Sequence, residues 1–401
     1  MKKTNILGIN ISNLTKEEIL NKIREYLNQE KQHYIVTPNP EIILAAQHDE
    51  ELFYILNNAD ISVLDGFGLK LGALSSGVNI QRITGADLIK DIFHIAEEQQ
   101  KKILILNWQG GLSTSEEIEK SIKKIYPNIS LSVMDIDREG KVIDYSKVKE
   151  ICPNILVTTA GAPFQEKIIF QALKKIPTAK LGIGIGGALD FLTCAVRRAP
   201  KIMRQIGLEW LWRLIKQPKR ITRIYNAVIV FTIKFLIWKY ILPFFYRQNV
   251  ACFLFKKENN RYRVLVVERL ERYNHWQLPQ GGTDCQDIVT AGARELREEI
   301  NCDKFKTLAG FKNLWKYEFG KVYPGKYGYD SGKSWGYKGQ RQGLLIAEFL
   351  GDDNCIKVNY WEHKNWKWVD VDILLDVVHS VRKDSVKIYL EKFKEYLAGN
   401  I

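Results

Sequence analysis

The sequence predicts an α/β protein with two folded domains, and three observations support this. Short apolar runs alternate with helical periodicity over the first 195 residues, which is typical of a Rossmann-like layered domain. Residues 197–247 carry 12 Lys or Arg and one acid, a net charge of +11 out of +13 for the 401-residue chain. From residue 248 two strand-like runs flank a polar turn. We therefore expect an α/β domain at 1–195, a basic amphipathic helical appendage at 196–247 and a second domain at 248–401.

Local signals place the elements of the first domain. Thr15 and Glu18 have the spacing of a capping box, which predicts a helix through Tyr26. The run from Ser115 to Ile125 has helical periodicity. Apolar runs predict strands at 33–37, 61–64, 103–106, 129–134, 155–159 and 181–185. The second domain begins with VACFLF and YRVLVVE around the turn KKENN, which predicts a β-hairpin.

Six cysteines are scattered through the chain without a CxxC pair, so we expect reduced thiols rather than a disulfide framework or a zinc site. The first residues turn polar too soon for a signal peptide. Together these features favour a cytoplasmic protein.

The basic segment at 196–247 points to an anionic partner, either a membrane surface or nucleic acid. Aromatic and aliphatic residues interleave with its charges, which favours a helix lying on the cytoplasmic face of a membrane. Residues 227–246 are almost long enough to span, but Lys234 and Lys239 would each cost about 3 kcal/mol at mid-bilayer. The alternative is that the apolar face packs on the protein's own core or on a second subunit.

Polar loops follow the predicted strands, where ligands bind in α/β folds. Asp65 comes directly after a buried strand and beside Gly66, where partial desolvation suits a carboxylate to act as a general base. A helix cap is the alternative role for this residue. Two further patterns resemble ligand-binding motifs without supporting one. GxGxxG at 182–187 lacks the acid expected about 20 residues after a dinucleotide-binding fingerprint. Asp135 and Asp137 form a DxD pair, which is more often solvated than bound to a metal.

The loops carry motifs in a characteristic order: TPNPE at 37–41, DGFG at 65–68, RITG at 82–85, GAPFQE at 161–166, GIGGALDF at 184–191, and RAP at 198–200 with GLEWLWRL at 207–214. This series resembles the WecB/TagA/CpsF family of glycosyltransferases (glycosyltransferase family 26) over about residues 4–240. The resemblance implies metal-independent, inverting transfer of N-acetylmannosamine, or a related sugar, from a UDP-sugar to N-acetylglucosamine on undecaprenyl diphosphate. Cys194 and the loop NWQGG depart from the family pattern.

The resemblance also implies roles for individual residues. Asp65 would be the base that deprotonates the acceptor hydroxyl. Substrate-binding residues would be Thr37, Asn39, Arg82, Gln165, Asp190, Arg198, Arg213 and Arg220. The basic segment would sit on the membrane and close over the lipid diphosphate, and members of the family often self-associate.

In the second domain, Glu295, Glu298 and Glu299 are spaced to lie on one face of a helix. Close carboxylates repel unless a cation neutralises them, and oxygen ligands favour Mg²⁺ or Mn²⁺. With Arg294 and the run WQLPQGG at 276–282, the segment resembles the Nudix box, and the resemblance covers about 248–395 as an α+β fold, an α/β/α sandwich.

The Nudix resemblance is nearest to the RNA pyrophosphohydrolase and dinucleoside polyphosphate hydrolase branch. It implies metal-assisted hydrolysis of a nucleotide or 5′-phosphorylated RNA, with Glu298 and Glu299 catalytic. Arg294 would pair with a carboxylate and hold the loop, and Tyr327, Trp335 and Tyr337 could stack a base. Asn301 replaces the glycine near the end of the box. The alternative function is a Nudix hydrolase whose transferase half only binds membrane or RNA.

Overall fold

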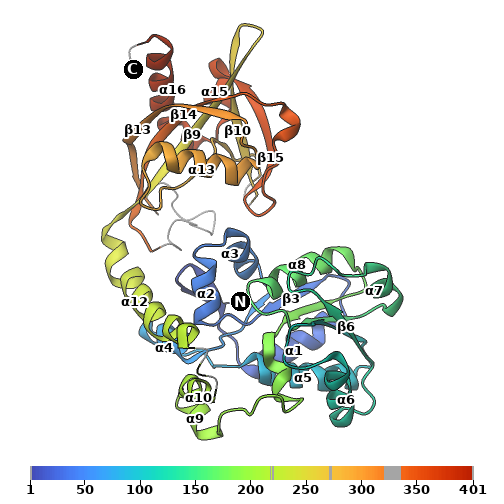
Figure 1. The fold of residues 1–401 in the computed structure, drawn as a ribbon. Helices are drawn as coiled ribbons and strands as arrows, with labels where there is room; N and C mark the ends of the chain where they lie inside the picture. Colours follow the sequence, from blue (N-terminus) through green and yellow to red (C-terminus); the bar gives the residue numbers. More distant parts are fainter. Residues whose placement is uncertain (1, 217, 219–220, 271–272, 320–335, 400–401) are drawn as a thin grey trace. The chain divides into compact units, whose positions relative to one another are not determined.

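The computed structural model describes all residues except 1, 217, 219–220, 271–272, 320–335 and 400–401. The chain forms two compact units, Met1–Leu236 and Ile237–Ile401 (Figure 1). Tyr327, Trp335 and Arg220, which the sequence singled out, lie outside the described residues.

The first unit is built on a six-stranded parallel sheet, as the sequence predicts. Its strand order is β4-β3-β8-β7-β5-β6. In chain order the strands are β3 (His33–Val36), β4 (Ile61–Ser62), β5 (Ile103–Trp108), β6 (Leu131–Ile136), β7 (Ile155–Thr158) and β8 (Leu181–Gly184). All six fall on predicted runs with ends shifted by up to two residues, and a β1–β2 hairpin (Lys3–Ile6, Ile9–Ser12) precedes them.

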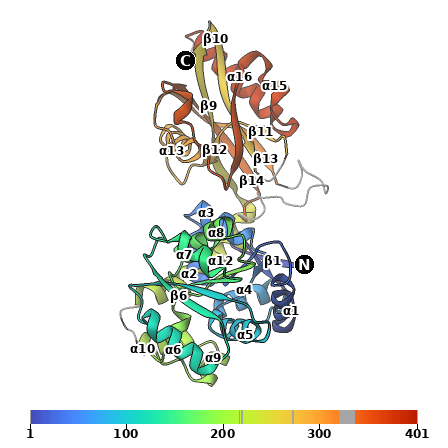
Figure 2. The same ribbon diagram turned by 90° about the vertical axis from the view of Figure 1, so that its right-hand side faces the viewer.

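Helices cover both faces of this sheet (Figure 2). One face packs on α1 (Lys16–Tyr26), α5 (Gly85–Glu98) and α6 (Ser115–Ile125). On the other lie α3 (Glu50–Asn57), α7 (Tyr145–Ile151) and α8 (Phe164–Lys175), while α2 (Pro40–Ala46) and α4 (Phe67–Ser75) follow the loops after β3 and β4. The predicted capping box is present, since Thr15 and Glu18 each accept a hydrogen bond from the other's backbone N–H.

The basic segment is helical, with α9 (Lys201–Gln205), α10 (Glu209–Lys216), α11 (Ile221–Tyr225) and α12 (Phe231–Leu236). Within the described residues, one continuous helical run, Ile221–Phe244, is long and apolar enough to cross a membrane by length and composition, and it is mostly exposed. One face of it does pack on the protein: the rings of Phe231 and Phe235 are buried against Gly68 and Gly72 of α4.

The opposite side of this run stays exposed, with large apolar side chains at Ile229, Ile233, Leu236, Ile237, Tyr240, Ile241 and Phe244. The alternative interpretation, an apolar face packed on the protein's own core, is therefore confirmed for Phe231 and Phe235, whereas attachment to a membrane stays a prediction. The segment contributes these two phenylalanine rings to the core of the first unit and leaves an apolar surface uncovered on its other side.

The second unit has a seven-stranded mixed sheet of order β11-β10-β9-β14-β13, with β12 on β9 and β15 on β10. Its strands are β9 (Tyr246–Glu258), β10 (Arg261–Arg269), β11 (Trp276–Gln277), β12 (Gln280–Gly282), β13 (Phe305–Glu318), β14 (Gly339–Phe349) and β15 (His363–Asp370). Helix α13 (Ile288–Ile300) covers one face, and α15 (Leu374–Val377) with α16 (Lys383–Leu397) covers the other. This is the predicted α/β/α sandwich, opened by the predicted β9–β10 hairpin.

The expectation that all six cysteines are free thiols is wrong for two of them. Cys302, just after α13, forms a disulfide with Cys355, and their Cα atoms are 5.7 Å apart. The pair is separated by 53 residues, so the contact depends on the tertiary fold and has no local sequence signal. The other four cysteines are free.

Candidate active sites

The first candidate site lies at the carboxyl edge of the parallel sheet, where Asp65 and Thr37 converge on the first residue of α5. The Asp65 Oδ2 accepts a hydrogen bond from the Gly85 N–H at 3.1 Å, and the Asp65 N–H donates to the Pro38 carbonyl. A Cβ placed at Gly85 would lie 3.5 Å from Thr37 Oγ1 and 3.9 Å from Asp65 Oδ2. The two predicted residues are thus neighbours, and Asp65 is only half-buried.

Asn39 has a local structural role at the same edge. It is the N-cap of α2, and its side-chain oxygen accepts from the Ile42 N–H at 3.0 Å. This bond satisfies one of the N–H groups left open at the start of the helix.

Two predicted arginines are held in ion pairs. Arg82 donates to Glu209 at 2.8 Å and to the Arg204 carbonyl at 2.9 Å. Arg198 makes two bonds to Asp87, at 2.5 and 2.8 Å. Partial burial alone would raise the pKa of Asp87, but the hydrogen bonds from Arg198 and Thr84 outweigh it and lower that pKa to about 2. Both guanidinium groups therefore join the basic segment to the catalytic domain.

A cleft of about 350 Å³ opens beside these ion pairs. Its walls come from α4, from the start of α5 and from residues 198–204. Phe67 and Thr84, which line it, are close in sequence to Asp65 and Gly85. The cleft therefore adjoins the Asp65 edge of the sheet.

Gln165 and Asp190 lie further along the same edge, after β7 and β8. Gln165 is buried and donates to Glu166 Oε1 at 2.7 Å. Asp190 Oδ1 accepts from Ser113 Oγ at 2.7 Å. Arg213 lies on α10, in the predicted basic segment. Gln165 bonds Glu166 and Asp190 bonds Ser113, whereas Asp65 bonds the first residue of α5, so the predicted residues fall into separate groups along the edge.

Glu166 is a buried acid that the sequence did not single out. Burial raises the pKa of its carboxyl to about 7, against the opposing effect of the hydrogen bond from Gln165. Its Oε2 atom is buried and has no hydrogen-bond partner among the described residues.

The second candidate site is on α13 and brings the three predicted glutamates to the loop after β12. Arg294 bonds Glu295 at 2.9 Å, Glu298 at 2.8 Å and the Gly282 carbonyl at 2.7 Å. The prediction that Arg294 pairs with a carboxylate and holds the loop is therefore confirmed. A Cβ at Gly281 would lie 1.8 Å from Glu295 Oε2, so only glycine fits there.

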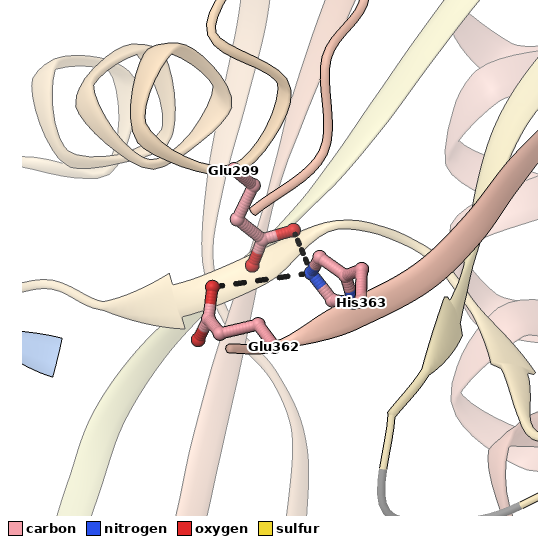
Figure 3. Close-up of side chains that lie close together, drawn as sticks. All are labelled: Glu299, Glu362 and His363. Carbon is pink, nitrogen blue, oxygen red and sulfur yellow. Dashed lines mark hydrogen bonds and ion pairs between the residues drawn. The ribbon is translucent and has the colours of Figure 1, made fainter. Parts of the chain in front are cut away.

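Glu299 is held on both oxygens, one by a residue that the sequence analysis missed. Its Oε1 accepts from the Gln280 N–H at 3.0 Å, and its Oε2 lies 3.0 Å from His363 Nε2. Figure 3 shows that His363 also faces Glu362, whose carboxylate is 4.0 Å from the same nitrogen. Glu299 and His363 are separated by 64 residues, and His363 reaches this position as the first residue of β15, which pairs with β10.

These groups fit a divalent cation. The carboxylates of Glu295, Glu298 and Glu299 come from one helix, and Glu362 and His363 face Glu299, with the ligand atoms of Glu299, Glu362 and His363 within 4.8 Å of one another. Carboxylate oxygens are the ligands preferred by Mg²⁺ and Mn²⁺.

Asn301 accounts for the missing glycine of the box. It ends α13 in the left-handed conformation, with φ 48°, which asparagine tolerates better than most residues. Its side-chain nitrogen donates to the Lys357 carbonyl and to Asn359 Oδ1, and the Asn359 amide donates to the Glu298 carbonyl. These bonds clasp the segment that leads to Glu362 and His363 onto the end of the helix.

Comparison with known proteins classifies both units. Residues 4–243 match the model described as "Glycosyl transferase WecG/TagA/CpsF family", more than half of the chain. The chain therefore belongs to this family of glycosyl transferases. Residues 245–390 match the NUDIX domain, a family of hydrolases.

Individual relatives sharpen the comparison. The chain is 33% identical over 202 residues to the N-acetylglucosaminyldiphosphoundecaprenol N-acetyl-beta-D-mannosaminyltransferase of Bacillus subtilis, covering 49% of this chain and 77% of that protein. It is 29% identical to the Staphylococcus aureus (strain MW2) enzyme of the same name, covering 57% and 90%. Among solved structures, a C. elegans Ap4A hydrolase binary complex matches 38% of this chain and 98% of its own, with 20% identity and a TM-score of 0.28.

Proposed function

We propose that the first unit transfers N-acetylmannosamine, or a closely related N-acetylhexosamine, from a UDP-sugar to N-acetylglucosamine carried on undecaprenyl diphosphate. The relatives carry this activity in their names, and the model of the transferase family matches residues 4–243, which include this unit. The observation that carries the proposal is the position of Asp65 beside Thr37 at the ligand-binding edge of a parallel sheet. The product would serve cell-surface polysaccharide or teichoic acid synthesis.

In this reaction Asp65 takes the proton of the acceptor hydroxyl. The hydroxyl oxygen bonds to the anomeric carbon of the donor while the bond from that carbon to the UDP oxygen breaks, so UDP leaves and the configuration inverts. The Gly85 N–H fixes the plane of the Asp65 carboxylate for this step. Thr37, Asn39, Gln165 and Asp190 are the proposed substrate contacts along this edge of the sheet, and no metal is needed.

The exposed apolar side of residues 221–244, flanked by the cations of the basic segment, supports peripheral attachment to the cytoplasmic face of the membrane. The lipid-linked acceptor lies in the same place. This exposed apolar side also allows self-association, which sedimentation of the protein without lipid would reveal as a dimer.

For the second unit we propose hydrolysis of a nucleoside diphosphate-linked substrate, with Glu295, Glu298 and Glu299 holding Mg²⁺ or Mn²⁺. The cation would activate water and shield the diphosphate charge. Gln280 and His363 hold the Glu299 carboxylate in place, and Arg294 holds Glu295 and Glu298 beside the loop. A nucleotide conjugate joined through a diphosphate and an RNA with a 5′-triphosphate end both present such a diphosphate.

The deciding experiment measures UDP release from UDP-N-acetylmannosamine with a lipid-linked N-acetylglucosamine diphosphate. Asp65→Asn keeps the size of the side chain and removes the base, so we expect a loss of at least about 100-fold in turnover. Asp303→Asn, an exposed aspartate in the Nudix unit, is the matched control. Full activity in Asp65→Asn, or none in the wild type with any UDP-sugar, would overturn the transferase proposal and leave the transferase half as a binding module. Flotation with anionic vesicles tests the membrane attachment.

A further inference from the structure

The disulfide of the second unit lies next to its candidate cation site. Cys302 follows the end of α13, the helix that carries the three glutamates. Its partner Cys355 ends a short 3-10 turn, and the next residues, 356–363, lead to Glu362 and His363. The disulfide therefore ties the glutamate helix to the segment that brings two further polar side chains to the site.

Within this segment, Asn359 passes the attachment on to the site. Its side-chain amide donates to the Glu298 carbonyl at 2.5 Å. Its own carbonyl accepts from the backbone N–H groups of Glu362 and His363, at 3.2 and 3.0 Å. The position of the His363 imidazole therefore depends on how firmly residues 356–359 are held against the end of α13.

Covalent and non-covalent attachments hold these residues together. Lys357 donates its backbone N–H to the Ile300 carbonyl at 2.8 Å and accepts from the Asn301 amide at 2.7 Å. The side chain of Ile356 is buried in the core beside α13. A hydrogen bond adds little net stability where water can replace it, whereas a disulfide opens only by reaction with a reductant. The disulfide is therefore the attachment that redox chemistry can release.

The disulfide is also accessible from one side. Cys302 is buried, but Cys355 is half-buried and follows three exposed residues, 352–354. Disulfides that persist in a reducing cytoplasm, where we expect this protein, are usually redox-active. A partly exposed disulfide beside a functional site fits that role.

We propose that the disulfide between Cys302 and Cys355 is a redox switch for the cation site of the second unit. The oxidised form holds residues 356–363 in place, and the reduced form releases them and binds the cation more weakly. This inference rests on the hydrolase function proposed for this unit and adds its regulation.

A dithiol is the reductant of this switch. One of its thiolates attacks the Cys355 sulfur, the S–S bond breaks, and Cys302 leaves with the electron pair and takes up a proton. The second thiol of the reductant then attacks the mixed disulfide and releases Cys355 as a thiol. Two protein thiols are formed, and the dithiol becomes a disulfide.

The test uses the full chain, oxidised or reduced with dithiothreitol that is then removed without air. Alkylation and mass spectrometry confirm each state, with four free thiols in the oxidised chain and six after reduction. Mn²⁺ binding is measured by calorimetry, and hydrogen exchange of residues 356–363 is measured without metal. We expect reduction to weaken Mn²⁺ binding about 10-fold and to accelerate this exchange.

Two variants complete the test. Cys355→Ser cannot form the disulfide and should bind Mn²⁺ like the reduced wild type, with or without dithiothreitol treatment. Cys152→Ser replaces an exposed free cysteine of the first unit and is the matched control, so it should respond to reduction like the wild type.

The switch and the cation site can fail separately. Equal Mn²⁺ affinity of the oxidised and reduced wild type would overturn the switch, as would equal exchange of residues 356–363 in the two forms. A Cys355→Ser variant that binds like the oxidised wild type would also overturn it. Absence of Mn²⁺ binding in both forms would instead refute the proposed cation site, and faster exchange after reduction would still show that the disulfide holds the segment.

Discussion

Glu166 gives a prediction whose size can be worked out from the structure. Burial raises the pKa of its carboxyl to about 7, from an ordinary value of 4.5. Between these two values the folded protein binds a proton that the unfolded chain has released. The stabilisation from this proton is fully present below about pH 4.5 and is lost as the pH rises through about 7. A difference of about 2.5 pKa units corresponds to about 3 kcal/mol of stability.

Glu166→Gln removes this titration while keeping the shape of the side chain. Its new amide N–H groups meet no partner at the former Oε2 position, which adds a destabilisation of about 1 to 3 kcal/mol that does not depend on pH. The informative quantity is therefore the change with pH in the stability difference between variant and wild type. From about pH 4 to pH 8 this difference should move by about 3 kcal/mol in favour of the variant.

Hydrogen exchange followed by mass spectrometry measures this difference locally, in peptides that contain β7, β8 and α8. Glu116→Gln, an exposed glutamate on α6, is the control and should show a difference that stays constant with pH. A constant difference for Glu166→Gln as well would refute the reasoning, because it would mean that the carboxyl is not protonated in the folded state near neutral pH.

Three further outcomes follow from the described contacts. His363→Ala should lower the affinity of the second unit for Mn²⁺ about 10-fold, measured by calorimetry, because one oxygen of Glu299 loses its partner. His363→Gln should restore part of this affinity. An unchanged affinity in His363→Ala would count against the metal site. Gly281→Ala should cost at least about 2 kcal/mol and abolish Mn²⁺ binding, since its methyl group would overlap the Glu295 carboxylate; normal binding would show that the loop can move aside. Phe231→Ala should destabilise the first unit by about 3 to 5 kcal/mol in urea unfolding, whereas the exposed Ile233→Ala should cost less than about 1 kcal/mol; equal costs would contradict the packing on α4.

Most of the fold was predictable because its signals are local. The capping pair Thr15 and Glu18 starts α1 through hydrogen bonds between residues three positions apart. The buried parallel strands are visible in the sequence as uninterrupted apolar runs. The glutamates of α13 share a helical face for the same reason, since their spacing alone puts them together.

The parts that the sequence did not reveal depend on contacts between distant residues. The partner of Glu299 is His363, 64 residues away, and the partner of Arg82 is Glu209, 127 residues away. The residues around Arg82 in the sequence do not distinguish a substrate contact from a structural ion pair. Its pairing with Glu209 is therefore seen only in the folded structure. The disulfide between Cys302 and Cys355 was missed on the same ground.

The seating of Phe231 and Phe235 on α4 has a consequence for how the enzyme would meet its substrate. Helix α4 starts two residues after Asp65, and its nine residues span about 13 Å. The buried side of residues 221–244 and the Asp65 carboxylate are therefore joined through one short helix. If the exposed apolar side of residues 221–244 rests among the lipid headgroups of a bilayer, the protein fixes the height of Asp65 above the membrane surface. A sugar carried on a lipid diphosphate is then met at a set distance from that surface.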